Sequence, residues 1–588
     1  MWNRRISVWE EKRFLDYVLI MLVSLHTLLW FREGTLYFQG DTGIPYNPIK
    51  NLNLLYFWWE QQGGIESWGF SQTFYLLFFV LLEKLNINLI ISQDIYIYLT
   101  RVIAGCAMYY LSAALTKNRF VCLSSAFIYL FSPFQLGLIF IYVYLPYVFM
   151  PLILGLYIKG LHNKSKVHLF LSSAALISLS CDFPNYRHYL VTVNLMLLYS
   201  LFYILAYFRE EKHILRHTLV SLVLVGLFNA LLTLWISLPV YNIVSNLTVT
   251  GLISNYNVGL DFGDYGWATL LNVIRLRGSA SLECGTGAVY ADTLVNNPLL
   301  IISSFYLPII AFSAVLFTGR QDKFIYFLLI VSILFLFAAK GTNHPLGSVY
   351  EGVVVNIPLA RTFRTSWLSI LPVVMAYSIL ASVSINSIYR YLSSKKHKYG
   401  YYFLTFSTFI ILVSSYPLVT GGYVQSVYSI TKSGGYIIPK AYYEIEEYLA
   451  DKLPPGKRFL KIPKSEGYIS TLHAWNYYGA NITPFIFSKH SHISSNHIRN
   501  SSHTLVDTIY RKAARNEFDK EFEMLLRMFN IKYLLLDGYI ENERFDAIAP
   551  TFINQLLQNG SFRPVKSFDR LYLIEYIDNS LPEHIRAY

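Results

Sequence analysis

The stretch FLDYVLIMLVSLHTLLWF, residues 14–31, decides the fold class of this chain. It is predominantly apolar, and as an α-helix rising about 1.5 Å per residue it is long enough to cross roughly 30 Å of hydrocarbon. Bulky aromatic sequence follows it instead of a small-residue cleavage site. We therefore expect it to remain in the protein as a first membrane span.

The composition agrees with a membrane protein. Of 588 residues, 54% are apolar and only 14% are charged, which is too little polar surface to cover a soluble globule of this size. The formal net charge of +12 comes from Lys and Arg in short clusters between apolar runs. Because these cations do not follow one polar face, we expect them to orient the chain in a bilayer, and we expect no nucleic-acid partner.

The sequence predicts a polytopic α-helical membrane domain over residues 1–425, with about eleven spans. The expected spans are 14–31, 94–115, 119–136, 138–158, 167–181, 188–207, 217–238, 297–318, 323–339, 365–386 and 402–418. Clusters of Lys and Arg fall in alternate connections, which are cytoplasmic by the positive-inside rule. This alternation predicts a multi-pass protein of the cell membrane, with a cytoplasmic N-terminus and an external chain after about residue 420.

Function is expected in the long external segments 32–93, 239–296 and 340–364. Within the first, Thr73–Leu82 is apolar but too short to span, which favours a helix lying in the membrane interface.

A small external α/β domain is predicted over residues 430–588. Its expected elements are helices at Tyr442–Asp451 and Asp519–Phe529 and strands at Phe459–Ile462, Tyr533–Leu536 and Leu571–Ile577.

The first external segment opens with GDTGIPYNP, residues 40–48, which carries Asp41. Its glycines permit a close turn and its prolines stiffen the chain that follows, so the carboxylate is expected on a fixed loop. A carboxylate held in this way suits a general base that takes a proton from an acceptor hydroxyl. The alternative is that Asp41 only caps a turn.

Several short motifs resemble the GT-C superfamily of membrane glycosyltransferases, most closely its arabinofuranosyltransferase D-like and YfhO-like branch. They are GDTGIPYNP, FSPF at 131–134, YLPYVFMPL at 144–152, GTNHPLG at 341–347 and IPLARTFRTSW at 357–367. The resemblance implies a polyprenyl-phosphate-linked sugar donor, a glycan or glycoconjugate acceptor, and Asp41 as catalytic base. WWEQQGG at 58–64 departs from the WWDYG-type motif of oligosaccharyltransferases.

Four arginines are candidates for holding the phosphate of the donor, because a guanidinium binds phosphate through a planar fork of donors. Arg361 and Arg364 precede the tenth expected span, Arg187 precedes the sixth, and Arg101 lies inside the second. The alternatives are juxtamembrane anchoring for the first three and snorkelling to the interface for Arg101.

Two further acids are candidates for binding the acceptor. Asp182 lies near Arg187, with which it alternatively forms a structural ion pair, and Glu60 lies beside two tryptophans that alternatively belong to an interfacial belt. No obligatory metal is predicted, because no second acid accompanies Asp41, although a divalent ion is not excluded. Cys181 and Cys284 both fall outside, where a disulfide or two free thiols are the alternatives.

The leading hypothesis is therefore an inverting membrane glycosyltransferase. The alternative is a non-catalytic membrane protein, either a transporter or flippase of lipid-linked sugars or a scaffold for cell-envelope assembly. A transporter would place broken helices or buried charges at the bilayer midplane, whereas the polar residues of this chain gather in the external segments.

Overall fold

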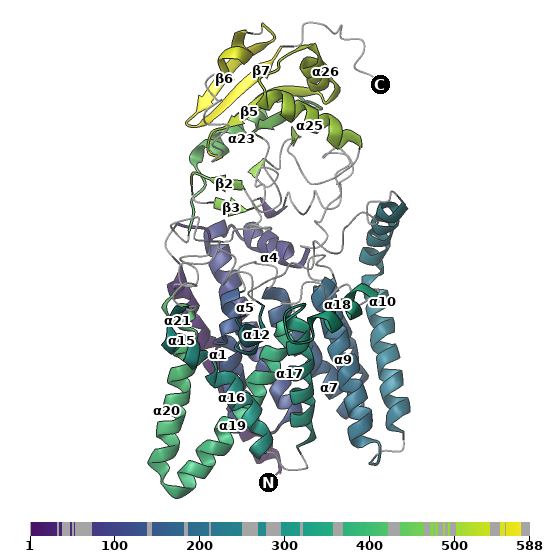
Figure 1. Ribbon diagram of the computed structural model, residues 1–588, viewed down its shortest axis with the longest axis vertical. Coiled ribbons are helices and arrows are strands. Elements are labelled where there is room, and N and C mark those ends of the chain that lie inside the picture. The colour runs from purple at the N-terminus through teal and green to yellow at the C-terminus, as the bar shows by residue number, and fades with distance from the viewer. Residues whose placement is uncertain are drawn as a thin grey trace. The chain divides into compact units, whose positions relative to one another are not determined.

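The computed structural model shows a bundle of helices and a C-terminal region that contains a sheet (Figure 1). The described residues are 2–31, 34–37, 47–49, 52, 73–137, 144–180, 186–210, 213–249, 268–277, 296–317, 322–356, 369–421, 435–463, 471–475, 477–479, 486–487, 492–493, 501–540, 553–558 and 560–577. Contacts divide the chain into two compact units. The membrane unit comprises Met1–Arg32, Phe70–Phe74 and Gln93–Ser429, and the sheet unit comprises Glu33–Gly69, Tyr75–Ser92 and Ile430–Tyr588.

The regular secondary structure of the membrane unit is helical in its described residues. Its α-helices are α1 (Trp2–Ser24), α5 (Leu89–Leu115), α6 (Arg119–Leu130), α7 (Tyr144–His162), α8 (Lys166–Ser180), α9 (Tyr186–Tyr207), α10 (Ile214–Val249), α12 (Leu270–Ile274), α15 (Pro298–Ser304), α16 (Tyr306–Phe312), α17 (Lys323–Ala339), α18 (Gly347–Asn356), α19 (Ile370–Lys395), α20 (His397–Ser414) and α21 (Tyr416–Thr420). Three 3-10 helices extend or join them: η1 (Leu25–Trp30), η3 (Pro133–Gly137) and η6 (Ser313–Phe317).

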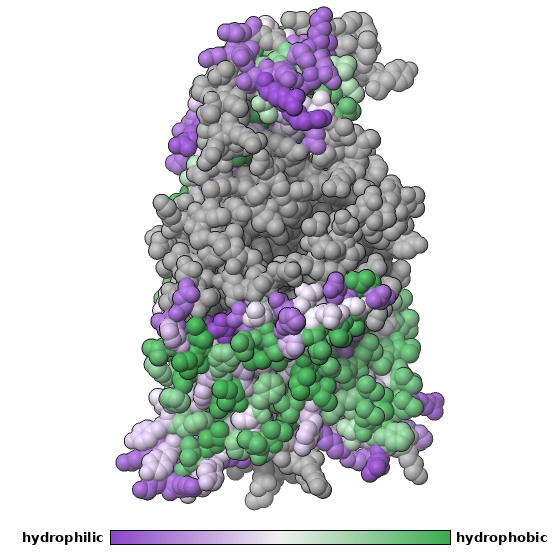
Figure 2. Space-filling view, in the orientation of Figure 1, coloured by the Kyte–Doolittle hydropathy of each residue, from purple (hydrophilic) through white to green (hydrophobic). Residues whose placement is uncertain are grey.

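Seven of these helical segments are long and apolar enough to cross a bilayer, and α8 and α17 are shorter apolar helices. The prediction of a multi-pass helical membrane protein is confirmed. The count of eleven spans stays a prediction, as does the cytoplasmic N-terminus. Figure 2 shows the apolar side chains of the membrane unit gathered in a belt, with hydrophilic residues at the end where α1 begins.

Helix α19 lies at the centre of the membrane unit. It packs against α6, α16, α17 and α20, and 89% of its most apolar window is buried, compared with 28% for α10. Ala376, Ser378, Ala381 and Ser382 are all buried on α19. In lipid, helices are not driven together by the hydrophobic effect, and small residues allow their backbones to pack closely. The small residues of α19 therefore suit a helix that packs against several others.

Several predicted helix limits need correction. The third expected span, 119–136, is not one helix: α6 ends at Leu130 and η3 begins at Pro133, because proline removes a backbone donor and clashes with the preceding turn. The expected span 297–318 agrees with the apolar helical segment Pro298–Phe317, which consists of α15, α16 and η6 in succession. Helix α10 has 36 residues and extends well beyond the expected end at residue 238.

The sheet unit contains a five-stranded sheet in the order β4-β1-β5-β7-β6. Its strands are β1 (Arg458–Ile462), β4 (His492–Ile493), β5 (Ile531–Asp537), β6 (Phe562–Phe568) and β7 (Leu571–Tyr576), and a separate hairpin joins β2 (Thr471–His473) and β3 (Tyr477–Gly479). Strand β1 pairs in parallel with β4 and β5, whereas β7 is antiparallel to both β5 and β6. The predicted α/β character is confirmed.

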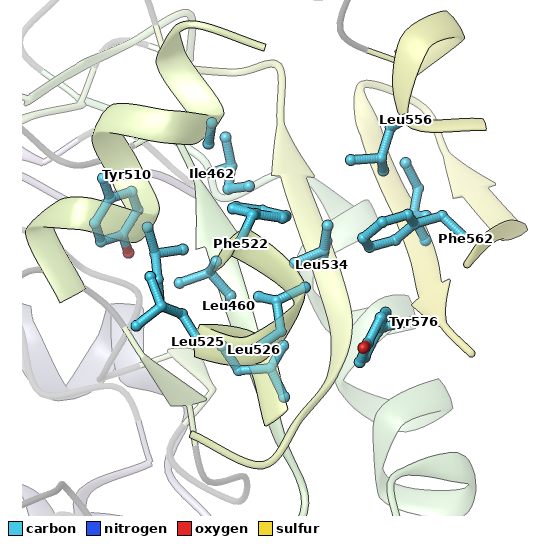
Figure 3. Packing of buried hydrophobic residues seen from close by; sticks show 14 of the residues in the cluster. Leu460, Ile462, Tyr510, Phe522, Leu525, Leu526, Leu534, Leu556, Phe562 and Tyr576 are labelled. Atoms are coloured by element: carbon cyan, nitrogen blue, oxygen red, sulfur yellow. The ribbon is translucent and has the colours of Figure 1, made fainter. Parts of the chain in front are cut away.

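Helices α23 (Lys440–Lys452), α25 (Ser501–Ala514) and α26 (Lys520–Met528) accompany the sheet. Figure 3 shows Phe522, Leu525 and Leu526 of α26 pointing toward Leu460 and Leu534 of the strands, and all five are at most 2% exposed. Alternate strand residues and the apolar stripe of an amphipathic helix meet here, so this contact forms the core of the sheet unit.

Described residues of the segment 32–93 also contribute to the sheet unit. Leu36 forms an antiparallel bridge with Tyr436, with N···O distances of 2.9 and 2.8 Å. The backbone amide of Ile49 donates to Oε2 of Glu83 at 2.9 Å, and Glu83 lies on α4 (Thr73–Lys84). Helix α4 confirms the short helix predicted in this segment, and its place in a membrane interface stays a prediction.

Candidate functional site

Arg101 on α5 is almost fully buried, with 1% of its surface exposed. Its Nη2 donates to the carbonyl of Leu130 at 2.7 Å, and its Nη1 donates to Oε1 of Gln135. The guanidinium carbon lies 5.0 Å from the centre of the Trp30 ring and 5.7 Å from that of Phe131. Hydrogen bonds in the guanidinium plane and aromatic rings over its faces are the two ways in which arginine is held rigidly.

The FSPF motif explains why a backbone carbonyl is free to accept a hydrogen bond from Arg101. Helix α6 stops before Pro133, and the carbonyl of Leu130, in its last turn, accepts from Arg101. Gln135, in the following 3-10 turn, in turn donates through Nε2 to the hydroxyl of Tyr147. Tyr147 belongs to the YLPYVFMPL motif, so two motifs that the sequence analysis singled out meet at Arg101.

Tyr147 is fixed against Tyr129. Their rings stack with centroids 4.3 Å apart and an interplanar angle of 2°, and each hydroxyl donates to the other's backbone carbonyl at 2.7 Å. Both side chains are fully buried. This reciprocal pair joins α6 to α7 and keeps the groups around Arg101 in place.

Trp30 fixes the point at which the chain leaves the first span. Its Nε1 donates to the carbonyl of Leu418 at 2.8 Å, which ties η1 to α21. Gly421, just after α21, has a φ of +77°, and a Cβ there would lie 3.2 Å from the Cα of Trp30. The close approach favours glycine at this position. The end of η1 is therefore fixed against α21.

Two further arginines lie beyond α12, and the sequence analysis missed them. Arg277 is 1% exposed and its Nη2 donates to the carbonyl of Ser414 at 3.1 Å. Burial, and then the charge of Arg275, lower the pKa of Arg277 to about 10. Arg275 donates to Oδ1 of Asn272 at 2.6 and 3.1 Å. The signal was the pair of arginines in LNVIRLRG, within the long segment 239–296 that the sequence predicts to be external.

Lys340 and the GTNHPLG motif form a compact turn at the end of α17. The Nζ of Lys340 donates to the carbonyl of Asn343 at 2.8 Å, and Nδ2 of Asn343 donates to the carbonyl of Ala268 at 3.2 Å. A Cβ at Gly347 would lie 1.8 Å from the carbonyl oxygen of Thr342, so this turn requires glycine. The motif therefore has a structural role in addition to any role in binding.

These contacts place buried cations along one end of the membrane unit, which we call the η1 end. Asn343 joins the Lys340 turn to α12, Arg277 joins α12 to the end of α20, and Trp30 joins α21 to Arg101. Buried cations bound to carbonyls and amides at a helix-bundle end form a region of positive potential. Such a region suits an anionic group carried by a lipid.

The other predicted site residues have side chains outside the part of the chain that the structure describes. Asp41, Asp182, Glu60, Arg361 and Arg364 lie outside the described residues. Arg187 is the second residue of α9, and its backbone alone is described. Cys181 and Cys284 also lie outside the described part. Within the residues that the structure describes, no three His, Cys, Asp or Glu side chains group as metal ligands.

No protein-family model and no curated protein matches the chain. Among solved structures, the fold is similar to that of the arabinofuranosyltransferase AftD from mycobacteria, with a TM-score of 0.65 and 13% sequence identity. The match covers 96% of this chain and 40% of AftD. The chain thus spans about two-fifths of the length of AftD, and at this identity the likeness establishes the fold alone.

Two more distant likenesses have TM-scores below 0.5 and add nothing to the fold assignment. ArnT from Cupriavidus metallidurans, bound to undecaprenyl phosphate, gives 0.46 at 13% identity, covering 98% of this chain and 100% of ArnT. The oligosaccharyltransferase AglB from Archaeoglobus fulgidus, bound to an inhibitory peptide and a dolichol-phosphate, gives 0.45 at 11% identity, covering 97% and 75%. The likeness to AftD supports the predicted fold class, a polytopic helical membrane protein with a small C-terminal α/β domain.

Proposed function

We propose, from the fold that this chain shares with an arabinofuranosyltransferase, that it is a membrane glycosyltransferase. It would move a sugar from a polyprenyl-phosphate-linked donor to an extracytoplasmic glycan or glycoconjugate, with inversion at the anomeric carbon. The observation that carries the proposal is the match to AftD over 96% of the chain. Because a fold alone does not fix a function, the proposal also needs residues suited to the chemistry.

The proposed reaction is a single displacement. The carboxylate of Asp41 takes the proton of an acceptor hydroxyl as that oxygen attacks the anomeric carbon. The bond from the anomeric carbon to the phosphate oxygen breaks, and its electron pair leaves with the polyprenyl phosphate. Arg361 and Arg364 offset the negative charge that develops on the leaving phosphate, as guanidinium groups do in other phosphate sites. Asp182 and Glu60 are proposed to bind the acceptor.

Arg101 is proposed to contribute at the η1 end, with Arg187 as a further phosphate ligand. The hydrogen bonds of Arg101 to Leu130 and Gln135, and its contact with the Trp30 ring, support a fixed positive charge close to the end of the first span. A fixed charge stabilises an anion at lower cost than a mobile one, because no reorganisation is needed when the anion binds. Arg101 also positions Trp30, from which the segment with Asp41 starts.

The test is turnover by the full chain in liposomes, with a panel of synthetic polyprenyl-phosphate sugars as donors, glycans as acceptors, and release of polyprenyl phosphate as the readout. Asp41→Asn should abolish release, since the amide accepts no proton. Glu83→Gln is the matched control in the same external segment, because the amide oxygen still accepts from Ile49. It should keep activity.

Two outcomes would count against the proposal. Full turnover by Asp41→Asn would remove Asp41 as the base. Passage of the intact donor across the liposome membrane, with no release of polyprenyl phosphate by the wild type, would favour the flippase alternative.

A further inference from the structure

His26 lies on η1, close to the end of the first membrane span. Its ring centre is 5.0 Å from that of Phe131 and 5.5 Å from that of Trp30. The guanidinium carbon of Arg101 lies 5.7 and 5.0 Å from the same two ring centres. His26 and Arg101 therefore flank the same pair of aromatic rings at the η1 end. The sequence analysis did not single out His26.

One nitrogen of the His26 ring has a structural role. Nδ1 lies 2.6 Å from the carbonyl oxygen of Val23, three residues earlier in the chain. Because a carbonyl oxygen only accepts, Nδ1 carries a proton and donates it to this bond. The bond fixes the orientation of the ring where α1 passes into η1.

The other nitrogen of the ring, Nε2, is buried and has no hydrogen-bond partner among the described residues. In the neutral ring the proton is on Nδ1, so Nε2 carries a lone pair and only accepts. An unpaired acceptor costs free energy when it is buried, and the hydrocarbon around a membrane span offers it no donor. Such an atom needs an explanation, and a bound ligand with a donor group provides one.

We propose that Nε2 of His26 accepts a hydrogen bond from a hydroxyl of the donor sugar, which makes His26 a substrate-binding residue. This inference rests on the proposed use of a polyprenyl-phosphate-linked donor, in which the sugar is joined directly to the phosphate. An ionised phosphate offers acceptor oxygens, which match the guanidinium of Arg101. A sugar offers hydroxyl donors, which match Nε2. The two groups that flank Trp30 and Phe131 thus complement the two adjoining parts of the donor.

Two substitutions separate the loss of the acceptor from the loss of the ring. His26→Asn keeps an N–H close to the position of Nδ1 and removes the acceptor, whereas His26→Gln has an amide oxygen that reaches the position of Nε2. Both variants lose the ring contacts with Phe131 and Trp30, so each is a matched control for the other.

The test is binding to the full chain in detergent, measured by native mass spectrometry at about pH 8, where a histidine ring is neutral. The probes are the polyprenyl-phosphate sugar that the wild type binds most tightly, its monodeoxy analogues, and polyprenyl phosphate without a sugar. His26→Asn should bind the parent sugar lipid about fivefold more weakly than the wild type, and His26→Gln should stay within about twofold of the wild type. Both variants should bind polyprenyl phosphate as the wild type does.

The monodeoxy analogues identify the hydroxyl. One of them should bind the wild type about fivefold more weakly than the parent sugar lipid does, because it lacks the donor group. The same analogue and its parent should bind His26→Asn equally, since the hydrogen bond is already lost in that variant.

Several results would overturn the inference and leave the transfer reaction standing. One is equal binding of the parent sugar lipid by the wild type and His26→Asn. A second is equal weakening in His26→Asn and His26→Gln, or equal loss of polyprenyl phosphate and the parent, because the ring or the fold would then be responsible. A third is wild-type binding of every monodeoxy analogue at the affinity of the parent. The expected binding pattern without release of polyprenyl phosphate in liposomes would instead support the sugar contact and remove the transfer reaction.

Discussion

Replacing Lys461 by Met should destabilise the sheet unit strongly. Lys461 and Asp537 lie on the adjacent strands β1 and β5, and their side chains are 2% and 0% exposed, with Nζ 3.2 Å from Oδ2. Burial lowers the pKa of Lys461, although the charge of Asp537 opposes this shift. In Lys461→Met the carboxylate would remain buried without its cation, which is the costly way to break such a pair.

The magnitude follows from the remaining partners of Asp537. Removing one member of a buried pair costs about 3–5 kcal/mol. Asp537 would still accept hydrogen bonds from the hydroxyl of Tyr442 at 2.8 Å and from the backbone amide of Tyr539 at 3.1 Å. We therefore expect a cost at the lower end of this range. About 3 kcal/mol corresponds to roughly 100-fold faster amide exchange through unfolding of the sheet unit.

The assay is hydrogen exchange of the full chain in detergent, followed on peptides from β5. Lys457→Met is the control, because its Nζ is exposed and reaches Asn530 only at 3.5 Å; its exchange should change by less than about threefold. The double variant Lys461→Met/Asp537→Asn should recover part of the protection, since no buried charge remains. Wild-type protection in Lys461→Met, or a double variant less protected than Lys461→Met, would refute this reasoning.

Three further predictions concern the sheet unit. Leu534→Ala, at a fully buried core position, should cost about 2–5 kcal/mol and speed exchange in β5, while α19 keeps its protection. Asp519→Ala removes the cap that accepts from Phe522 N at 2.9 Å and should cost about 1 kcal/mol, seen as faster exchange in α26; unchanged exchange would contradict it. Burial raises the pKa of Glu575, but bonds to Lys532 and Arg563 outweigh it and hold the pKa below its ordinary 4.5. The ionised Glu575 carboxylate therefore stabilises the folded state fully above about pH 4.5, and this stabilisation is lost as the pH falls through the lower pKa of Glu575 in the folded protein. The unfolding temperature should fall on acidification more steeply in the wild type than in Glu575→Gln.

The secondary structure of the sheet unit was largely predictable because its signals are local. Asp519 precedes an amphipathic run and caps α26, and the expected strand Phe459–Ile462 differs from β1 by one residue. Strand β6 was missed because its exposed polar residues weaken the apolar pattern. The hydrogen bonds that pair β6 with β7 hold β6 in an extended conformation that its own sequence does not strongly favour.

The site was less predictable because its contacts join distant residues. The bond from Trp30 to Leu418 spans 388 positions, and no local pattern shows it. Arg101 was recognised because a charge inside an apolar run stands out, whereas its binding by Leu130 and Gln135 depends on how the helix breaks at Pro133. Arg277 looked ordinary in sequence, since its burial arises only from packing against the end of α20.

The central claim is tested most directly by an experimental structure of the full chain with a non-hydrolysable polyprenyl-phosphate sugar. The account predicts the phosphate within hydrogen-bond reach, about 3 Å, of Arg361 and Arg364, with Asp41 facing the anomeric carbon from the side opposite the phosphate. A lipid phosphate bound elsewhere, with Asp41 remote from the sugar, would contradict it.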